Sequence, residues 1–551
     1  MIRRVTLRRF KRFESVTFDV PGHIVLAGPN NCGKTTLLQA VACWSLALGR
    51  WKELNDFQRH GGAYTKAPIA RHAFYAVPLR AFDSLWNDRD YHGTVEIEIA
   101  DDRGWTVTME LLADSTEQIY VRPKPAAEPD TVRRAALNTV FVPAMGGLSI
   151  DEPVYQRPKI EQLLGQGKPG DVIRNLLWEA HQDQAAWNAL DESIGRLFHC
   201  RLLPPDVATA DIIAQYEPLG GGPRFDIASA GSGFQQVLML LTFLHTRPSS
   251  VLLLDEPDAH MHVILQDAIY AELRSVAAPR NSQLIVATHS EVIINSVDPA
   301  ELCSVVGPPR LLASTIERKK VADALGVLTQ LDILRAEGAR GVLYLENFTD
   351  LNILREWARI LRHPLHEFLT TELFWRPTVF EHRPGARGVR AREHYDALRL
   401  VRDDLPGLEL VDGDADPRVP ETPITGQGLQ RLRWRRYEVE SYLVHPAALE
   451  RFVAQVVGGP QELAVGPMRA YIDKTFTETF SNDPFAPNPL IEAYFEKRKA
   501  RTEIIPPILE AAGIHGFPYT RFHQIAALME PDEIHPEVKE KLDLIQRAFR
   551  L

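Results

Sequence analysis

The sequence predicts an α/β protein with two successive α/β domains and a helical C-terminal region. Three observations support this prediction. A glycine-rich loop lies between an apolar strand and a helix near the start, and short apolar runs at 250–255 and 283–288 are typical of buried parallel strands. A second alternation of strand and helix patterns begins after about residue 335. We expect a first domain at 1–320 with a helical insertion at about 60–225, a second domain at 335–450, and helices at 451–551.

The individual segments follow from local patterns. Residues 2–27 alternate and then become apolar, which predicts strands ending in a loop, and a helix follows at about 34–48. Residues 92–110 predict a β-hairpin with the turn DDRG, and residues 158–198 predict two amphipathic helices. In the second domain, ARGVLYLEN and GLELVDGDAD predict strands, and DLNILREWARIL predicts a helix.

The composition is that of an ordinary globular protein, with 45% hydrophobic and 24% charged residues. The formal net charge of −10 argues against a uniformly basic nucleic-acid-binding protein, although it is compatible with a local basic groove. The four cysteines have no spacing typical of a metal site or a disulfide framework. Because we find neither a signal peptide nor a run of roughly 18 apolar residues, we expect a cytoplasmic protein without a membrane span.

The loop at 28–35, GPNNCGKT, matches the phosphate-binding pattern G-x-x-x-x-G-K-[ST], and it follows the apolar strand HIVLA and opens a helix. Gly28 and Gly33 permit the tight turn whose N–H groups surround phosphates. Lys34 would reach the β- and γ-phosphates, and the Thr35 hydroxyl would bind Mg²⁺. The sequence therefore predicts a Mg·ATP site whose loop residues are Gly28, Asn30, Asn31, Gly33, Lys34, Thr35 and Thr36.

The run VLLLDE at 251–256 is an apolar strand that ends in two acids. At this position Asp255 would hold Mg²⁺, and Glu256 would orient and polarise the attacking water. A Ser/Gly-rich turn upstream, SAGSGFQQ at 229–236, opens a helix, and such a turn is a phosphate-binding device in its own right. The second apolar run, QLIVA, is followed by THS, which contains His289.

Together these motifs resemble those of ABC-type ATPases. SAGSGFQQ is similar in position to the ABC signature, LSGGQ in its commonest form, although its letters differ. EPDAHMH at 256–262 resembles the extended Walker B of the SMC-like branch. The resemblance implies that Ser232 and Gly233 of one subunit complete the ATP site of another, that His289 contacts the γ-phosphate, and that the ATPase domains form a homodimer or a higher homo-oligomer.

Acidic residues follow two predicted strands of the second domain. GVLYLENFTDL delivers Glu346 at a strand end and Asp350 just after it, and GLELVDGDAD delivers Asp412, Asp414 and Asp416. Carboxylates at neighbouring strand ends can hold one or two Mg²⁺ or Mn²⁺ ions and so support phosphodiester cleavage. The alternative is an α/β domain with acidic loop ends and no metal.

This pattern resembles the Toprim fold, in which a glutamate follows one strand and D-x-D follows a later one. The resemblance implies catalytic roles for Glu346, Asp412 and Asp414. Toprim glutamates are usually followed by glycine, whereas Asn347 stands here, and its side chain could narrow the approach of a scissile phosphate.

The segment RLRWRRYEVESYLVHP at 431–446 resembles a late segment of the Toprim modules of the OLD (overcoming lysogenization defect) nucleases. Glu440 is the best match to its metal-binding acid, and Glu438 is the second. The four arginines of this segment and the basic loop RPGARGVRAR at 383–392 are candidate contacts to DNA phosphates, and solvated basic surfaces are the alternative.

An SMC-like ABC ATPase followed by a Toprim-like module resembles the OLD-family ATP-dependent endonucleases over nearly the whole chain. The resemblance implies an ATP hydrolase and a Mg²⁺- or Mn²⁺-dependent endonuclease that acts on DNA in bacterial anti-phage defence. The alternative is an ATPase sensor or scaffold whose acidic site is inactive and which controls a separate effector partner. An SMC-like DNA-repair ATPase is disfavoured because the sequence has no long heptad repeat.

Overall fold

The computed structural model forms two compact units, Met1–Gly326 and Val327–Leu551, and each is described by itself. It describes residues 1–55, 57, 59–74, 76–77, 79–143, 147–259, 261, 263–378, 390–414, 420–457, 461–476 and 489–551.

The central sheet of the first unit has six strands in the order β10-β14-β15-β3-β16-β17. Neighbouring strands are parallel from β10 to β16, and β17 runs antiparallel to β16. The apolar runs predicted as buried parallel strands are β14 and β15, which pair with each other. The strands of this sheet are β3 (Ile24–Ala27), β10 (Thr139–Val142), β14 (Val251–Asp255), β15 (Gln283–Thr288), β16 (Leu302–Ser304) and β17 (Arg310–Leu311).

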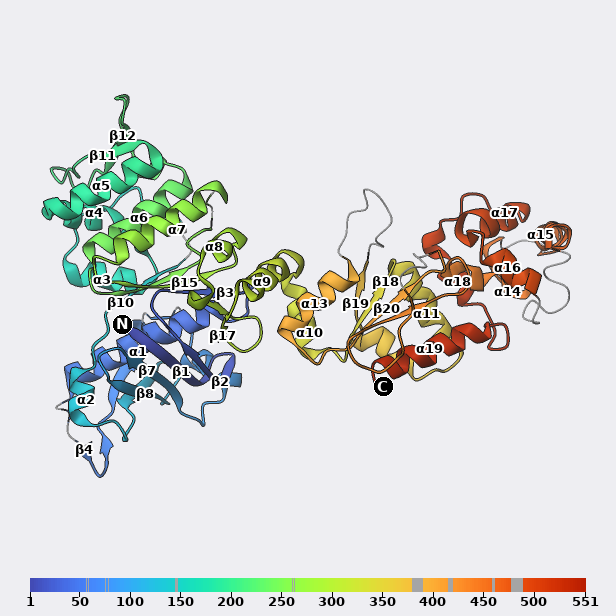
Figure 1. Ribbon diagram of the computed structural model, residues 1–551, viewed down its shortest axis with the longest axis horizontal. Helices are drawn as coiled ribbons and strands as arrows, with labels where there is room; N and C mark the ends of the chain where they lie inside the picture. The colour runs from blue at the N-terminus through green and yellow to red at the C-terminus, as the bar shows by residue number, and fades with distance from the viewer. Residues whose placement is uncertain are drawn as a thin grey trace. The chain divides into compact units, whose positions relative to one another are not determined.

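Side chains of the central strands alternate between two hydrophobic cores. Ile24 and Leu26 of β3 pack into the core that contains α1 (Lys34–Leu54), whereas Val25 and Ala27 pack into the core on the opposite face. Because both faces are covered, the strands are apolar throughout. Figure 1 shows α1 on one side of β3 and β15, and helices on the other side. The helices of the second core are α3 (Arg157–Gly165), α4 (Ile173–Gln182), α5 (Gln184–Phe198), α6 (Ser232–Thr246), α7 (Val263–Ala277), α8 (Glu291–Ser296) and α9 (Thr315–Val327).

A second, antiparallel sheet packs against α1 in the order β2-β1-β7-β8-β9-β6. Trp44 of α1 reaches this sheet, since its indole N–H donates to the carbonyl oxygen of Val107 at 2.8 Å and its ring stacks on Trp105. The strands are β1 (Ile2–Phe10), β2 (Phe13–Asp19), β6 (Ala67–Ala70), β7 (Val95–Asp101), β8 (Thr106–Ala113) and β9 (Gln118–Pro123).

The segment predicted as a helical insertion is mixed, which corrects that part of the prediction. It supplies β6 to β9 of the antiparallel sheet and β10 of the central sheet, together with α2 (Pro129–Arg134) and α3 to α5. Small sheets add β4 (Arg59–His60), β5 (Ala63–Tyr64), β11 (Cys200–Leu202), β12 (Gln215–Pro218) and β13 (Phe225–Asp226). Residues 158–198 form three helices, not two, because the Asp183 side chain accepts hydrogen bonds from the N–H groups of Ala185 and Ala186 and starts α5 there.

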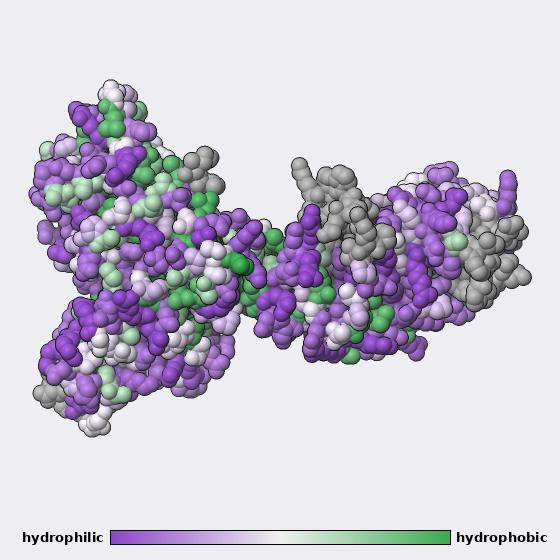
Figure 2. All heavy atoms as spheres, viewed as in Figure 1, coloured by the Kyte–Doolittle hydropathy of each residue, from purple (hydrophilic) through white to green (hydrophobic). Residues whose placement is uncertain are grey.

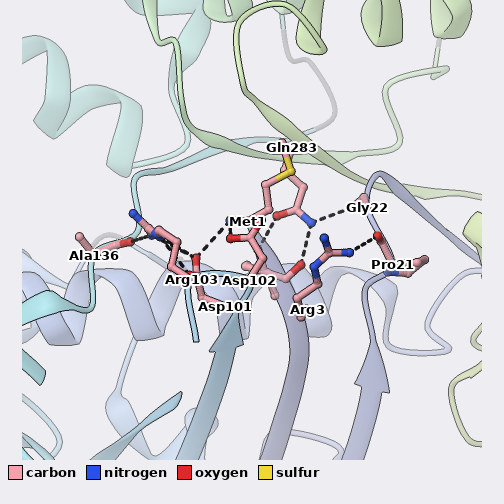
Figure 3. A network of polar contacts seen from close by, with 10 residues as sticks. Met1, Arg3, Pro21, Gly22, Asp101, Asp102, Arg103, Ala136 and Gln283 are labelled. Atoms are coloured by element: carbon pink, nitrogen blue, oxygen red, sulfur yellow. Dashed lines mark hydrogen bonds and ion pairs between the residues drawn. The ribbon is translucent and has the colours of Figure 1, made fainter. Parts of the chain in front are cut away.

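Gln283 joins the two sheets of the first unit (Figure 3). Its side chain is buried, with Nε2 donating to the carbonyl oxygens of Ile2 at 2.9 Å and Gly22 at 2.7 Å, and Oε1 accepting from the N–H of Ile2 at 2.7 Å. Nearby, the Arg103 guanidinium binds the Asp101 carboxylate at the end of β7. The hydrogen bonds of Gln283 connect β15, which precedes His289, with β1 of the antiparallel sheet.

The second unit has a parallel four-stranded sheet in the order β19-β18-β20-β21. Its strands are β18 (Val342–Leu345), β19 (Phe374–Pro377), β20 (Gly407–Val411) and β21 (Leu429–Arg433). The helices α10 (Gln330–Gly338) and α13 (Ala391–Val401) contact each other, and Figure 1 draws them side by side.

A single hydrophobic core in the second unit joins the sheet to the C-terminal helices. Residues of the predicted domain at 335–450 and of the helical region at 451–551 therefore share one core. Its helices are α11 (Phe348–Ile360), α12 (Leu365–Glu367), α14 (Pro446–Val457), α15 (Gln461–Phe476), α16 (Pro489–Phe495), α17 (Ile505–Ala511), α18 (His523–Ala526) and α19 (Pro536–Ala548), with the short helical turns η7 (Phe368–Glu372), η8 (Val439–Leu443) and η9 (Ala500–Ile504).

Hydrophilic residues predominate on the face drawn in Figure 2, and apolar residues are scattered among them. In the described part of the chain, no helix is both long enough and apolar enough to cross a membrane.

Candidate functional sites

The loop between β3 and α1 has the geometry of a phosphate-binding loop. Gly33 has a φ of 109°, and a Cβ atom there would lie 2.6 Å from Cζ of Phe13, so this position requires glycine. Lys34 is 4% exposed, and its ammonium donates to the carbonyl oxygens of Gly28 at 2.7 Å and Pro29 at 2.8 Å. The ammonium is therefore held over the loop that would surround phosphates.

Thr35 and Asp255 meet across the central sheet. The Thr35 hydroxyl lies 2.9 Å from both carboxylate oxygens of Asp255, although 220 positions separate the two residues. They come together because β15 pairs with both β14 and β3, which brings the carboxyl ends of these strands to one edge of the sheet. Burial raises the pKa of Asp255, and the hydrogen bond from Thr35 opposes this shift.

Glu256 and His289 form the polar side of the same site. Glu256 has a φ of 49°, a conformation that is uncommon outside glycine and that often marks functional positions. Its Oε1 atom lies 3.3 Å from Nδ1 of His289 and 3.9 Å from Nζ of Lys34. The hydrogen bond with His289 lowers the pKa of Glu256, and the same bond raises the pKa of His289.

Asp258 and Thr288 hold the end of β15 next to His289. Neither residue was predicted from the sequence. Asp258 is buried and accepts a hydrogen bond from the Thr288 hydroxyl at 2.6 Å. The N–H of Ser290 donates to that hydroxyl at 2.9 Å, so contacts on both sides of His289 fix the end of β15. The available signal was the third acid in DEPD together with the THS that follows the next strand.

Several predicted nucleotide contacts lie at the edge of the loop. Asn30 and Asn31 are exposed, and Asn31 has a φ of 62°. The guanidinium of Arg12 donates to the carbonyl oxygen of Asn31. Thr36 is half-buried in the first turn of α1.

Ser232 is exposed at the first position of α6, and Gly233 follows it. Within the described residues, neither has a hydrogen bond or ion pair to the loop at 28–35. The turn that precedes α6 begins at Asp226. The buried Arg174 guanidinium of α4 donates to both carboxylate oxygens of Asp226 at 2.9 and 2.8 Å. The turn is thus tied to α4, and Ser232 at the start of α6 is open to solvent.

In the second unit, the predicted acids converge at the carboxyl ends of β18 and β20, which are parallel neighbours. Glu346 follows β18, Asp412 follows β20, and their side chains share a hydrogen bond. Asp350 joins them from the first turn of α11, and Glu440 joins them from η8. We call Glu346, Asp350, Asp412, Glu438 and Glu440 the acidic cluster.

Local contacts hold the acidic cluster in place. Asn347 caps α11, since its side-chain oxygen accepts from the N–H of Thr349 at 2.7 Å, and the Asp350 carboxylate accepts from the N–H of Asn347 at 3.3 Å. The residue that stands in place of the expected glycine therefore positions Asp350. The Asp412 carboxylate accepts from the N–H of Val439 at 3.1 Å.

Burial raises the pKa of Glu438, and the nearby charge of Asp414 adds to that shift. Asp414 lies at the edge of the cluster. It is exposed, and its N–H donates to the carbonyl oxygen of Tyr437 at 3.2 Å. Gly413 permits this turn, because a Cβ atom there would lie 2.3 Å from the carbonyl oxygen of Arg436. Asp416 lies outside the described residues.

Burial and mutual repulsion favour the protonated forms of several carboxylates in the acidic cluster. Burial raises the pKa of Asp412 well above its ordinary value, and the neighbouring carboxylates of Asp350, Glu440 and Glu346 add to the shift. Burial also raises the pKa of Asp350 to about 6 and that of Glu440 to about 8. Shifts of this kind are typical of sites that bind a cation or carry out proton transfer.

The donor set of the acidic cluster suits Mg²⁺ or Mn²⁺, because carboxylate oxygens are the ligands these ions prefer. Glu440 is 1% exposed, and among the described residues its buried Oε1 atom has no hydrogen-bond partner, although it lies 3.9 Å from the guanidinium of Arg501. In the described part of the chain, however, no three His, Cys, Asp or Glu side chains are already arranged as a metal site. Binding an ion there requires the side chains to move.

Arg501, which our reading of the sequence missed, supplies the positive charge that contacts the cluster. Its guanidinium lies 4.0 Å from Glu346, 3.5 Å from Glu438 and 3.9 Å from Glu440. Its N–H also donates to the Glu438 carboxylate. Arg501 comes from η9, far along the chain, and nothing in the local sequence distinguishes it from neighbouring basic residues.

The arginines predicted as DNA contacts face carboxylates of the second unit. Arg431 pairs with Glu409 at 3.2 Å, and the buried Arg436 pairs with Glu492 at 2.9 Å. Arg435 lies 3.5 Å from Glu540. These three arginines therefore have structural partners. Most of the basic loop at 383–392 lies outside the described residues.

Comparisons with known proteins bear on the first unit. Residues 137–295 match the family described as "AAA domain, putative AbiEii toxin, Type IV TA system". No curated protein matches the chain. Similar solved structures include an SMC head bound to the C-winged helix domain of ScpA (16% identity, 58% of this chain and 99% of that chain, TM-score 0.36).

Two further SMC heads are similar. One is from Thermotoga maritima (13% identity, 55% of this chain and 94% of that chain, TM-score 0.30). The other, bound to the C-terminal domain of ScpA and derived from Pyrococcus furiosus, has an extended coiled coil (14% identity, 58% and 97%, TM-score 0.34). The family match and the strand–loop–helix geometry together identify the first unit as an α/β P-loop ATPase-type domain.

Proposed function

We propose that the first unit binds and hydrolyses ATP with Mg²⁺ and that the acidic cluster of the second unit is a metal-dependent nuclease site acting on DNA. The observation that carries the first half is the contact of Thr35 with both carboxylate oxygens of Asp255. A hydroxyl from the start of α1 and a carboxylate from a neighbouring strand end are the pair that shares Mg²⁺ in P-loop hydrolases. Mg²⁺ bound there would draw charge from the phosphates.

The hydrolytic roles follow from the contacts at this site. The Lys34 ammonium donates to two carbonyl oxygens of the loop. When ATP binds, it would exchange these carbonyls for phosphate oxygens. Glu256 polarises the attacking water, and its lowered pKa keeps it ionised for that role. His289 holds Glu256 and contacts the γ-phosphate.

The exposed helix start of α6 supports assembly through the first unit. Ser232 and Gly233 of one copy would complete the nucleotide site of a second copy, because their N–H groups are at a solvent-facing helix N-terminus. The active form is therefore a homodimer or a higher homo-oligomer. Glu256→Gln should bind ATP, stall hydrolysis and accumulate this assembly, which size-exclusion chromatography with light scattering would detect; turnover at the wild-type rate would remove Glu256 from the catalytic role.

The convergence of Glu346, Asp350, Asp412 and Glu440 supports the nuclease half of the proposal. These residues would hold Mg²⁺ or Mn²⁺ beside a DNA phosphate, and the exposed Asp414 would complete the ligands from the rim. The metal would activate water and stabilise the leaving oxygen. The predicted role in anti-phage defence rests on the resemblance in architecture alone.

Plasmid cleavage tests the nuclease. The purified chain is incubated with supercoiled plasmid and Mg²⁺ or Mn²⁺, with and without ATP, beside Glu346→Gln and Asp412→Asn. We expect metal-dependent nicking that both variants lose. Asp404→Asn is the matched control, because the Asp404 side chain is 71% exposed and pairs with Arg402 outside the acidic cluster.

A second candidate function is an ATPase sensor or scaffold that controls a separate effector. The observation that favours it is Arg501, whose contacts with three carboxylates occupy part of the acidic cluster. An absence of cleavage under every condition, with ATP hydrolysis intact, would establish this candidate over the nuclease.

A further inference from the structure

Arg501 is fixed against one side of the acidic cluster by three kinds of contact. Its guanidinium lies within 4.0 Å of Glu346, Glu438 and Glu440, and its own N–H donates to Glu438. The guanidinium also lies over the ring of Tyr519, 5.3 Å from the ring centroid. With a side-chain exposure of 19%, Arg501 is a built-in member of the site.

The backbone around Arg501 is equally fixed. Arg501 lies in η9, a π-helical turn, between the buried residues Ala500 and Ile504. Turns of this kind occur often at functional positions, where the irregular backbone directs a side chain inward. η9 contacts η8, which carries Glu440, so the cation and its partner carboxylates come from adjoining elements.

The other side of the cluster is farther from Arg501. Asp350 and Asp412 are each 7% exposed, and the charge of Arg501 acts on both, but its ion pairs among the described residues are with Glu346, Glu438 and Glu440. Their carboxylates accept hydrogen bonds from backbone N–H groups, which leaves part of each group for a further ligand. Arg501 therefore makes direct ion pairs on the Glu438–Glu440 side, whereas it acts on Asp350 and Asp412 only from a greater distance.

We propose that Arg501 permanently fills one of the two cation positions of the acidic cluster, so that the site takes a single divalent ion, held by Glu346, Asp350 and Asp412. Two-metal nuclease sites place two cations roughly 3.5–4 Å apart between shared carboxylates. Here a guanidinium neutralises Glu438 and Glu440, and it also fixes the second unit's C-terminal segment against the sheet. The inference rests on the proposed metal site, and Arg501 is a positioning residue in it.

Metal stoichiometry and Mn²⁺ electron paramagnetic resonance test the inference with the full chain and without nucleotide. Titration of the wild type with Mn²⁺ should show one ion more per chain than Asp412→Asn, which reports binding elsewhere. Arg501→Met keeps the aliphatic stem and removes the charge, so it should bind a second ion and show the spin coupling of a close Mn²⁺ pair. Arg501→Lys should return to one uncoupled ion, and the exposed Arg498→Met is the matched control.

The outcomes separate the inference from the proposed function. Two coupled ions in the wild type would overturn the single-ion inference and leave the metal site standing. Equal Mn²⁺ binding by the wild type and Asp412→Asn would overturn both. The wild-type measurement decides the first point even if Arg501→Met does not fold, and circular dichroism of each variant establishes whether it does.

Discussion

The hydrogen bonds from Thr35 to Asp255 make a quantitative prediction for Thr35→Val. Valine keeps the shape of the side chain and removes the hydroxyl that meets both carboxylate oxygens at 2.9 Å. A hydrogen bond to a charged group contributes about 1.5–3 kcal/mol, and about 1.36 kcal/mol corresponds to a factor of ten. We therefore expect Thr35→Val to lower the kcat/KM for Mg·ATP by about 10- to 150-fold.

A coupled-enzyme ATPase assay with a Mg²⁺ titration measures this effect. Thr35→Ser keeps the hydroxyl and should retain most of the activity. Thr17→Val is the control for the loss of a threonine hydroxyl, because Thr17 is exposed in β2 and its hydroxyl meets that of Thr6. If Thr35→Val hydrolyses ATP at the wild-type rate with the same Mg²⁺ dependence, the assignment of Thr35 and Asp255 to one Mg²⁺ is wrong.

Three further predictions follow from the pKa shifts and from the contact between sheets. His289→Ala should move the acidic limb of the kcat–pH profile to higher pH, since the His289 hydrogen bond is the largest cause of the lowered pKa of Glu256; an unmoved limb in steady-state ATPase assays would contradict this. Mn²⁺ affinity should rise with pH, because binding must displace protons from Asp350, with a pKa of about 6, and from Asp412, whose pKa is raised well above its ordinary value by burial. Calorimetry in buffers of different ionisation enthalpy should therefore detect proton release, and binding without release would exclude these groups as ligands. Gln283→Leu should destabilise the first unit by about 1–3 kcal/mol, because it leaves buried backbone groups without partners, and urea unfolding that matches the wild type would refute this.

The elements around the nucleotide site were predictable because their signals are local. The apolar runs that became β14 and β15 are buried on both faces, and such strands have few alternatives to a parallel sheet. The loop at 28–35 carries its own turn chemistry, which Gly33 shows with a φ of 109°. The strand order β14-β15-β3 then brings Asp255 close to Thr35, and this proximity depends on the fold and not on a local sequence pattern.

The insertion was harder to predict because its strands depend on distant partners. The predicted hairpin at 92–110 is confirmed, since β7 and β8 pair antiparallel, but the pairing of β7 with β1 at the start of the chain was not predicted. Residues 139–142 pair with β14, more than a hundred positions later. A short strand of this kind gains its stability from tertiary pairing, which local propensity does not report. The extra helix boundary at Asp183 was within reach, since an aspartate before a helical run is a common cap.

The two candidate sites share one arrangement of strand ends and helix starts. They differ in the part of the chain that supplies the basic side chain, Lys34 in the first unit and Arg501 in the second. In each, an acid at the end of one strand meets a group from the first turn of the helix that follows another strand of the same sheet: Thr35 with Asp255 in the first unit, and Asp350 with Asp412 in the second. Lys34 is adjacent to Thr35 in the sequence, so the motif that reveals the hydroxyl also reveals the cation. Arg501 reaches its cluster only because the C-terminal helices share a core with the sheet, and for that reason no local pattern could reveal it. The same arrangement makes the charge of the second site depend on the packing of those helices, so any change that shifts η9 should alter metal binding even where no ligand is touched.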